Sequence, residues 1–71
     1  MERREDALAD LNRAIELDPG DAQAIAGRGE TYRCLERYDE AQADFSRAIE
    51  LDPDDTEYRV QHAEICRLMG S

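Results

Sequence analysis

Long apolar runs are missing from this sequence, and so are tryptophan and lysine. No stretch approaches the 18 or more apolar residues that a membrane-spanning helix needs, and the N-terminus MERREDALAD lacks the apolar segment of a signal peptide. These absences predict a soluble, cytoplasmic chain. Every basic side chain other than His62 is arginine, which together with abundant alanine and aspartate is typical of a GC-rich bacterial genome.

Positive charge is also scarce, because nine arginines face 18 acidic residues and the net charge is −9. A chain this acidic is repelled by the phosphates of nucleic acids and by anionic lipids. We therefore expect neither a nucleic acid nor a membrane as a partner. With 71 residues the chain holds one domain at most, and a single core of this size is only marginally stable.

Few residues suggest chemistry. Cys34 and Cys66 lie 32 positions apart, which is not a metal-ligand spacing, and in an intracellular chain both are expected to be thiols. His62 has Glu64 two positions further on, but residues with this separation point to different faces of a helix. The sequence contains no phosphate-binding loop and no His/Cys cluster. We expect no enzyme activity, no cofactor and no metal site.

The most informative pattern is an internal repeat. The block ALADLNRAIELDP at 7–19 returns as AQADFSRAIELDP at 41–53, a shift of 34 residues, and the two copies align without a gap along the chain. A period of this length is typical of stacked two-helix units. Such solenoids usually present binding surfaces and not catalytic sites.

Periodicity and stop signals divide the chain into four helices. Apolar residues at three- and four-residue steps, with an Asp-Pro stop after the first and third segments, predict helices at about 4–17, 22–35, 39–51 and 56–69. Asp21 is placed to cap the second helix, and Asp54 with Asp55 the fourth. Asp39 and Gln42 form a capping box for the third. The sequence thus predicts an all-α fold.

Large and small residues alternate along the two central helices. We expect Phe45 and Tyr32 to anchor the core, with Gly29 among the small residues that let the helices approach closely. Gly27 should point away from the hairpin partner. A helical glycine costs about 1 kcal/mol relative to alanine, so Gly27 either leaves room for a ligand or is simply tolerated.

These residues resemble the tetratricopeptide repeat (TPR) family. The resemblance is carried in 22–55 by Gly29, Tyr32, Tyr38, Ala41, Phe45, Ala48 and Pro53, and upstream by Ala7, Leu11, Ala14 and Pro19. It implies helix-turn-helix repeats stacked as a right-handed α-solenoid. The single domain at 1–71 would hold the second helix of one repeat (4–18), a complete repeat (22–55) and the first helix of the next (56–69). We expect a piece or a remnant of a longer array. Arg28 and His62 stand where the family usually has apolar residues.

The family resemblance implies a non-catalytic scaffold for protein–protein interaction, with a concave groove for a peptide or a partner domain. The groove positions would be Gln23, Ala26, Gly27, Glu30, Arg33, Cys34, Glu57, Val60, Gln61, Glu64, Arg67 and Leu68. Arg33 and Arg67 either recognise the ligand or form surface ion pairs with Glu30 and Glu64. Some members hold the carboxylate of chaperone tails with Lys and Asn, where this chain has Ala26 and Glu30. We therefore expect no binding of chaperone tails.

Self-assembly is the alternative hypothesis, as an element of a larger repeat protein. The first helix carries apolar residues on more than one face, and the last helix offers an apolar face to a helix that would follow it; the residues are Leu8, Leu11, Ile15 and Leu17, with Ala63, Cys66 and Met69. We expect a homo-oligomer. A closed two-fold dimer through the first helix is favoured over pairing of the first helix with the last, which would leave the assembly open to growth.

Overall fold

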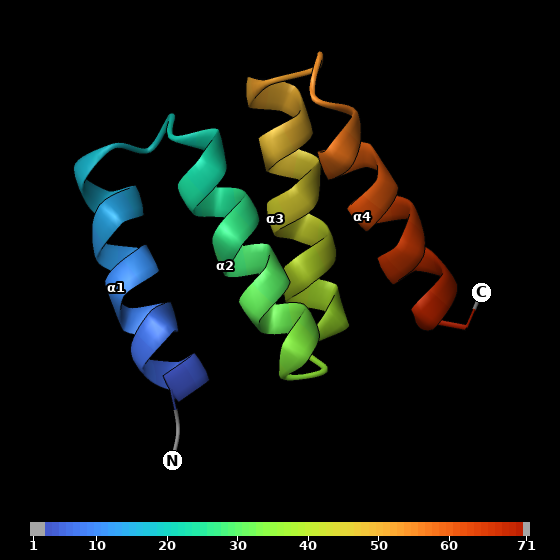
Figure 1. The fold of residues 1–71 in the computed structure, drawn as a ribbon, viewed down its shortest axis with the longest axis horizontal. Coiled ribbons are helices and arrows are strands. Elements are labelled where there is room, and N and C mark those ends of the chain that lie inside the picture. The colour runs from blue at the N-terminus through green and yellow to red at the C-terminus, as the bar shows by residue number, and fades with distance from the viewer. Residues whose placement is uncertain (1–2, 71) are drawn as a thin grey trace.

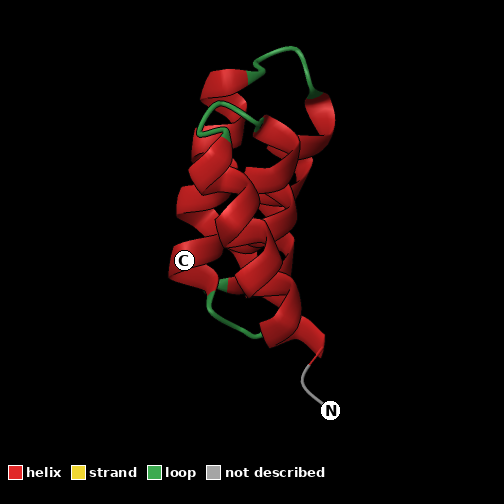
Figure 2. Cartoon of the chain, turned by 90° about the vertical axis from the view of Figure 1, so that its left-hand side faces the viewer, coloured by secondary structure: helices red, strands yellow, loops and turns green. Residues whose placement is uncertain are grey.

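The computed structural model describes residues 3–70, and these residues form four helices joined by short turns (Figure 1). The helices are α1 (Arg3–Leu17), α2 (Ala22–Cys34), α3 (Tyr38–Leu51) and α4 (Thr56–Leu68). Each helix packs on the next one in the chain, and Figure 2 shows helices and loops only over the described residues. The all-α prediction is confirmed. Met1, Glu2 and Ser71, which the predicted domain included, lie outside the described residues.

Two of the three predicted caps are present. The Asp21 carboxylate accepts a hydrogen bond from the Ala24 N–H at 3.2 Å, and the Asp55 carboxylate accepts one from the Glu57 N–H at 2.9 Å. A cap of this kind contributes about 1 kcal/mol to helix stability. Among the four described helices, none combines the length and the apolarity that crossing a membrane requires.

The capping box predicted from Asp39 and Gln42 is wrong. Glu36 adopts a left-handed conformation with φ of 63°, which makes the α2–α3 turn so tight that α3 already begins at Tyr38. Asp39 therefore lies inside the first turn, where its negative charge interacts favourably with the positive end of the helix dipole. The N-cap residue is Arg37, which makes no side-chain cap and instead pairs with Glu40 at 2.7 Å.

The core lies between α2, α3 and α4, and Phe45 is at its centre. As predicted, Phe45 is buried, with 2% of its surface exposed. A Cβ atom built on Gly29 would lie only 2.9 Å from the Phe45 ring, so the close approach of α2 and α3 depends on this glycine. Tyr32, the second predicted anchor, is only half-buried. Its ring lies beneath the guanidinium groups of Arg28 and Arg37.

The side chain of Arg28 links three of the helices. Arg28 of α2 donates two hydrogen bonds to the Asp44 carboxylate of α3, at 2.7 and 2.8 Å, and a third at 2.8 Å to the side-chain oxygen of Asn12 in α1. Asp44 is 5% exposed and is the only buried charged residue among 5–70. The hydrogen bonding between Arg28 and the Asp44 carboxylate raises the pKa of Arg28. Where the family usually has an apolar contact, this chain has a bidentate ion pair.

Alanine at the two α2 glycines should have opposite effects. A Cβ on Gly27 would lie 3.5 Å from a Leu11 methyl, an ordinary contact, so Gly27→Ala should raise the free energy of unfolding by about 1 kcal/mol through helix propensity. Gly29→Ala should lower it by about 1–3 kcal/mol because Phe45 must move. Urea denaturation followed by circular dichroism measures both. Changes of the same sign would contradict these contacts.

Removing Arg28 should lower the free energy of unfolding more than removing the charge of Asp44. Arg28→Met leaves the buried Asp44 carboxylate without its partner and should lower the free energy of unfolding by about 3 kcal/mol. Asp44→Asn leaves Arg28, whose side chain is partly exposed, able to reach water, so the loss should be about 1 kcal/mol. Equal losses of unfolding free energy in urea denaturation would show that an unpaired buried carboxylate is not the main cause of the destabilisation.

Candidate functional site

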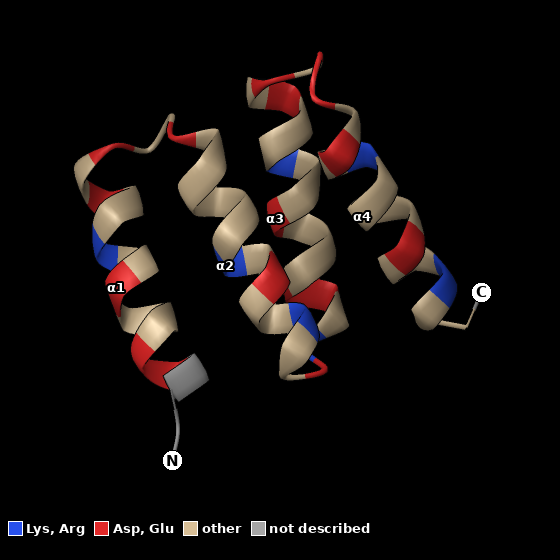
Figure 3. Cartoon of the chain, viewed as in Figure 1, with Lys and Arg blue, Asp and Glu red and all other residues tan. Residues whose placement is uncertain are grey.

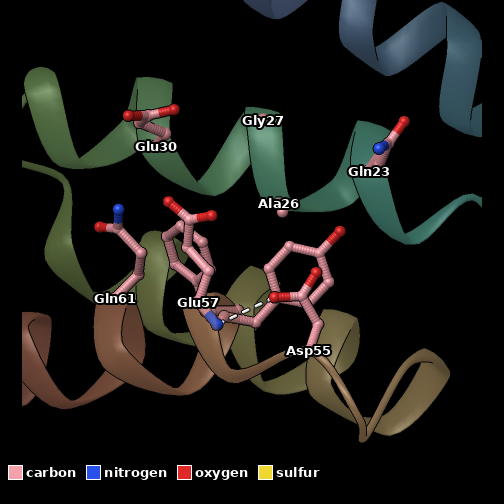
Figure 4. Close-up of a pocket in the computed structure, with 9 residues that line it drawn as sticks. Gln23, Ala26, Gly27, Glu30, Asp55, Glu57 and Gln61 are labelled. Atoms are coloured by element: carbon pink, nitrogen blue, oxygen red, sulfur yellow. Dashed lines mark hydrogen bonds between the residues drawn. The ribbon is translucent and has the colours of Figure 1, made fainter.

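A pocket of about 350 Å³ lies between α2 and α4. It is lined by Gln23, Ala26, Gly27 and Glu30 of α2, by Phe45 of α3, and by Asp55, Glu57, Tyr58 and Gln61 at the start of α4 and along it. Figure 4 shows the polar side chains of α2 on one side of the pocket and those of α4 on the other. The residues of α4 follow those of α2 by 34 positions, which is the period of the sequence repeat.

The pocket brings together half of the groove positions that the resemblance implied. These six are Gln23, Ala26, Gly27, Glu30, Glu57 and Gln61. Three others, Val60, Glu64 and Arg67, line a second pocket on α4. The remaining three, Arg33, Cys34 and Leu68, line neither of these pockets.

The two groove arginines lie beside acidic residues of their own helices. Arg33 is 3.8 Å from Glu30, and Arg67 is 3.6 Å from Glu64. Exposed pairs with this i,i+3 spacing contribute only a few tenths of a kcal/mol. Neither arginine lines the pocket between α2 and α4.

Sequence reasoning missed three residues of the pocket: Phe45, Asp55 and Tyr58. Phe45 was assigned to the core, and it is indeed a core residue that also lines the pocket. Asp55 was assigned to a helix cap, and it both caps α4 and borders the pocket. Tyr58 stands 34 positions after Ala24, and neither residue was among the predicted groove positions. The repeat pattern therefore gave no reason to place Tyr58 in the pocket.

The pocket has an apolar floor and acidic walls. Phe45, Tyr58 and Ala26 are all buried, and they form the apolar part. The walls carry the carboxylates of Glu30, Asp55 and Glu57, while no arginine lines the pocket. Such a combination fits a side chain that has an aliphatic stem and a positive end.

Negative potential at the pocket comes from both Asp-Pro turns as well as from its walls. Figure 3 shows acidic residues on all four helices and in the α1–α2 and α3–α4 turns. Burial raises the pKa of Tyr58, and the charges of Asp55, Asp52 and Asp21 raise it further. Because these aspartates belong to two different turns, the field at Tyr58 is a property of the folded chain.

His62 lies outside this pocket and contacts two polar side chains. Its Nε2 is 3.2 Å from the Ser46 hydroxyl, and its Nδ1 is 4.0 Å from the sulfur of Cys66, a neighbour that the sequence analysis did not identify. Cys66 also accepts a hydrogen bond from the Gln42 amide at 3.1 Å. Neither pocket includes His62 or Cys66. Within residues 3–70, no three His, Cys, Asp or Glu side chains converge as metal ligands would.

The chain is similar to known proteins in its sequence and in its structure. Residues 22–55 match the tetratricopeptide repeat family. The structure is similar to the first TPR domain of Spaghetti (RPAP3), which was solved bound to the HSP90 peptide SRMEEVD, with a TM-score of 0.86 and 28% sequence identity. The match covers 90% of this chain and 51% of that one, so this chain spans about half of its length. No curated protein matches. The similarity confirms the TPR-like packing of four successive helices.

Proposed function

Because residues 22–55 are a tetratricopeptide repeat and the described chain has the fold of that family, we propose that the groove between α2 and α4 binds an extended peptide that places a basic side chain in the pocket. Tetratricopeptide repeat domains are typically non-catalytic, so this chain acts as a protein–protein interaction scaffold and not as an enzyme. The observation that supports a basic ligand is the pocket itself, which has three carboxylates and no arginine in its lining.

A lysine or arginine side chain matches the pocket in two respects. Its methylene groups can lie against Phe45 and Tyr58, which gains the free energy of burying apolar surface. Its charged end can then reach Glu30 and Glu57 on opposite walls (Figure 4). Hydrogen bonds between a cation and a carboxylate are about twice as strong as those between neutral groups.

The rest of the peptide would lie along the two first helices. Gln23 and Gln61 border the pocket on opposite walls, and each amide can both donate to and accept from a peptide backbone. The backbone N–H and C=O groups of an extended peptide have no hydrogen-bond partners within the peptide. Contacts of this kind do not depend on the peptide sequence, so the selectivity comes from the acidic pocket.

The peptide bound by the first TPR domain of Spaghetti (RPAP3) has three acidic residues and one arginine. The positions that hold a chaperone-tail carboxylate with Lys and Asn in some relatives are Ala26 and Glu30 in this chain. Glu30 would repel such a carboxylate, because like charges at close range are unfavourable. We infer that this groove selects the opposite charge and does not bind chaperone tails.

A cytoplasmic location suits this function. Cys34 and Cys66 are both thiols, the form that persists in a reducing compartment. The arginine-only basic composition supports a bacterial source for the chain.

Peptide binding can be tested with fluorescein-labelled heptapeptides that differ only in the central residue: Arg, Lys, Ala or Glu. We expect binding in fluorescence anisotropy for Arg and Lys, with at least a tenfold weaker affinity for Ala and none for Glu. Glu30→Gln and Glu57→Gln should each weaken binding of the Arg peptide about tenfold, which corresponds to one charge-assisted hydrogen bond of about 1.4 kcal/mol.

Glu50→Gln is the matched control, since it makes the same change at an exposed α3 residue that does not line the pocket. It should leave the affinity unchanged. Equal affinity for the Arg and Glu peptides, or equal losses in all three variants, would contradict the assignment of the pocket. Added salt should weaken binding of the Arg peptide, because the pairing is electrostatic.

A further inference from the structure

One polar group of the pocket between α2 and α4 has no hydrogen-bond partner in the described part of the chain. Tyr58 of α4 lines this pocket and is only 8% exposed. Its hydroxyl makes no hydrogen bond to any side chain or backbone group of residues 5–70. Buried polar groups are usually hydrogen-bonded, because an unpaired one has lost its contacts with water. The partner of this hydroxyl therefore comes from outside these residues.

The Tyr58 hydroxyl is open to the pocket and is not enclosed in the core. Among the side chains of residues 5–70, the Arg33 Nε is the only fully enclosed nitrogen or oxygen that lacks a hydrogen bond. The Tyr58 hydroxyl also lacks one, so it is not fully enclosed. Of the two pockets named above, Tyr58 lines only the one between α2 and α4. A ligand in this pocket can therefore reach the hydroxyl.

Two carboxylates on the α4 side of the pocket can also accept further hydrogen bonds. Asp55 uses its Oδ1 to cap α4 at 2.9 Å, and its second oxygen has no hydrogen bond within residues 5–70. The Glu57 carboxylate forms no ion pair with any described side chain, whereas Glu30 on the opposite wall already has Arg33 at 3.8 Å. Figure 4 shows Asp55 and Glu57 together on the α4 side. This side therefore offers acceptors from a hydroxyl and two carboxylates.

Arginine and lysine differ in how many of these acceptors they can use. An ammonium group is a compact point charge with three N–H donors on one nitrogen, whereas a guanidinium carries five N–H donors spread over a rigid plane. Acceptors that belong to three different side chains suit the spread donors better than the compact ones. The arrangement around Tyr58 thus favours one of the two basic side chains.

We infer that the Tyr58 hydroxyl makes this pocket selective for arginine over lysine, an inference that rests on the function proposed for the groove. The guanidinium of the bound arginine donates to the Tyr58 oxygen as well as to the carboxylates of Asp55 and Glu57, and its stem lies against Phe45. Burial raises the pKa of Tyr58, and the charge of Asp55 raises it further. The phenol therefore keeps its proton at neutral pH and adds no further negative charge beside the two carboxylates.

Tyr58→Phe tests this inference, because it removes the hydroxyl and keeps the ring. The probes are the fluorescein-labelled heptapeptides with a central Arg, Lys or Ala, measured by fluorescence anisotropy. For the unaltered chain we expect the Arg peptide to bind about fivefold more tightly than the Lys peptide, as one additional hydrogen bond would provide. Tyr58→Phe should weaken binding of the Arg peptide about fivefold and change the affinity for the Lys peptide by less than about twofold, so the preference is lost.

Tyr38→Phe is the matched control, since it removes the hydroxyl of a half-buried tyrosine of α3 that lines neither pocket. It should leave both affinities unchanged. Tyr58→Phe should also keep the melting temperature of the unaltered chain, because the Tyr58 hydroxyl makes no hydrogen bond within residues 5–70. A purely structural role of this hydroxyl would instead lower the melting temperature and weaken both peptides alike.

Equal affinities of the Arg and Lys peptides for the unaltered chain would overturn the inference. So would a Tyr58→Phe variant that keeps the preference for arginine or that weakens both peptides equally. The function proposed for the groove would survive each of these results, provided that both basic peptides bind more tightly than the Ala peptide. An Arg peptide that binds no better than the Ala peptide would refute the proposed function and the inference together.

Discussion

The structure depends above all on the pairing of one buried carboxylate. Asp44 lies between α2 and α3, where an unpaired charge would be strongly unfavourable, and Arg28 satisfies it with two hydrogen bonds. The same guanidinium donates to Asn12, so one side chain of α2 is bonded to both α1 and α3. Buried ion pairs often add little to stability compared with apolar residues, but their geometry admits few alternatives. The wall of the groove that α2 provides is positioned by this pair.

The elements that were predicted correctly are those that depend on local pattern. The Asp-Pro stops and the caps at Asp21 and Asp55 act within one helix or one turn, and the 34-residue period appears when the sequence is compared with itself. The sequence therefore contains all the information that these predictions need. Arg28 could not be interpreted in this way, because its partners lie 16 positions away on either side and on two other helices. The capping box failed for a related reason. The left-handed conformation of Glu36, which moves the start of α3, has no signal in a residue that is neither glycine nor asparagine.

The candidate site shows the same division between local and spatial information. Its outward-facing residues, such as Glu30 and Gln61, could be predicted from the family pattern, because groove residues recur at fixed positions of that pattern. Its floor was not, since Tyr58 replaces an alanine of the preceding copy and Phe45 serves the core and the pocket at once. Fold alone does not determine what such a groove binds. The preference proposed for this groove therefore depends on the charge of a few wall residues.

The aromatic composition gives the pocket a further property. The chain has three tyrosines and no tryptophan, so its ultraviolet emission comes from tyrosine alone. Tyr58 is the buried one of the three and lines the pocket, whereas Tyr32 and Tyr38 are half-buried elsewhere on α2 and α3. The natural fluorescence of the unlabelled chain is thus partly a reporter of the groove, and it is unobscured by any indole.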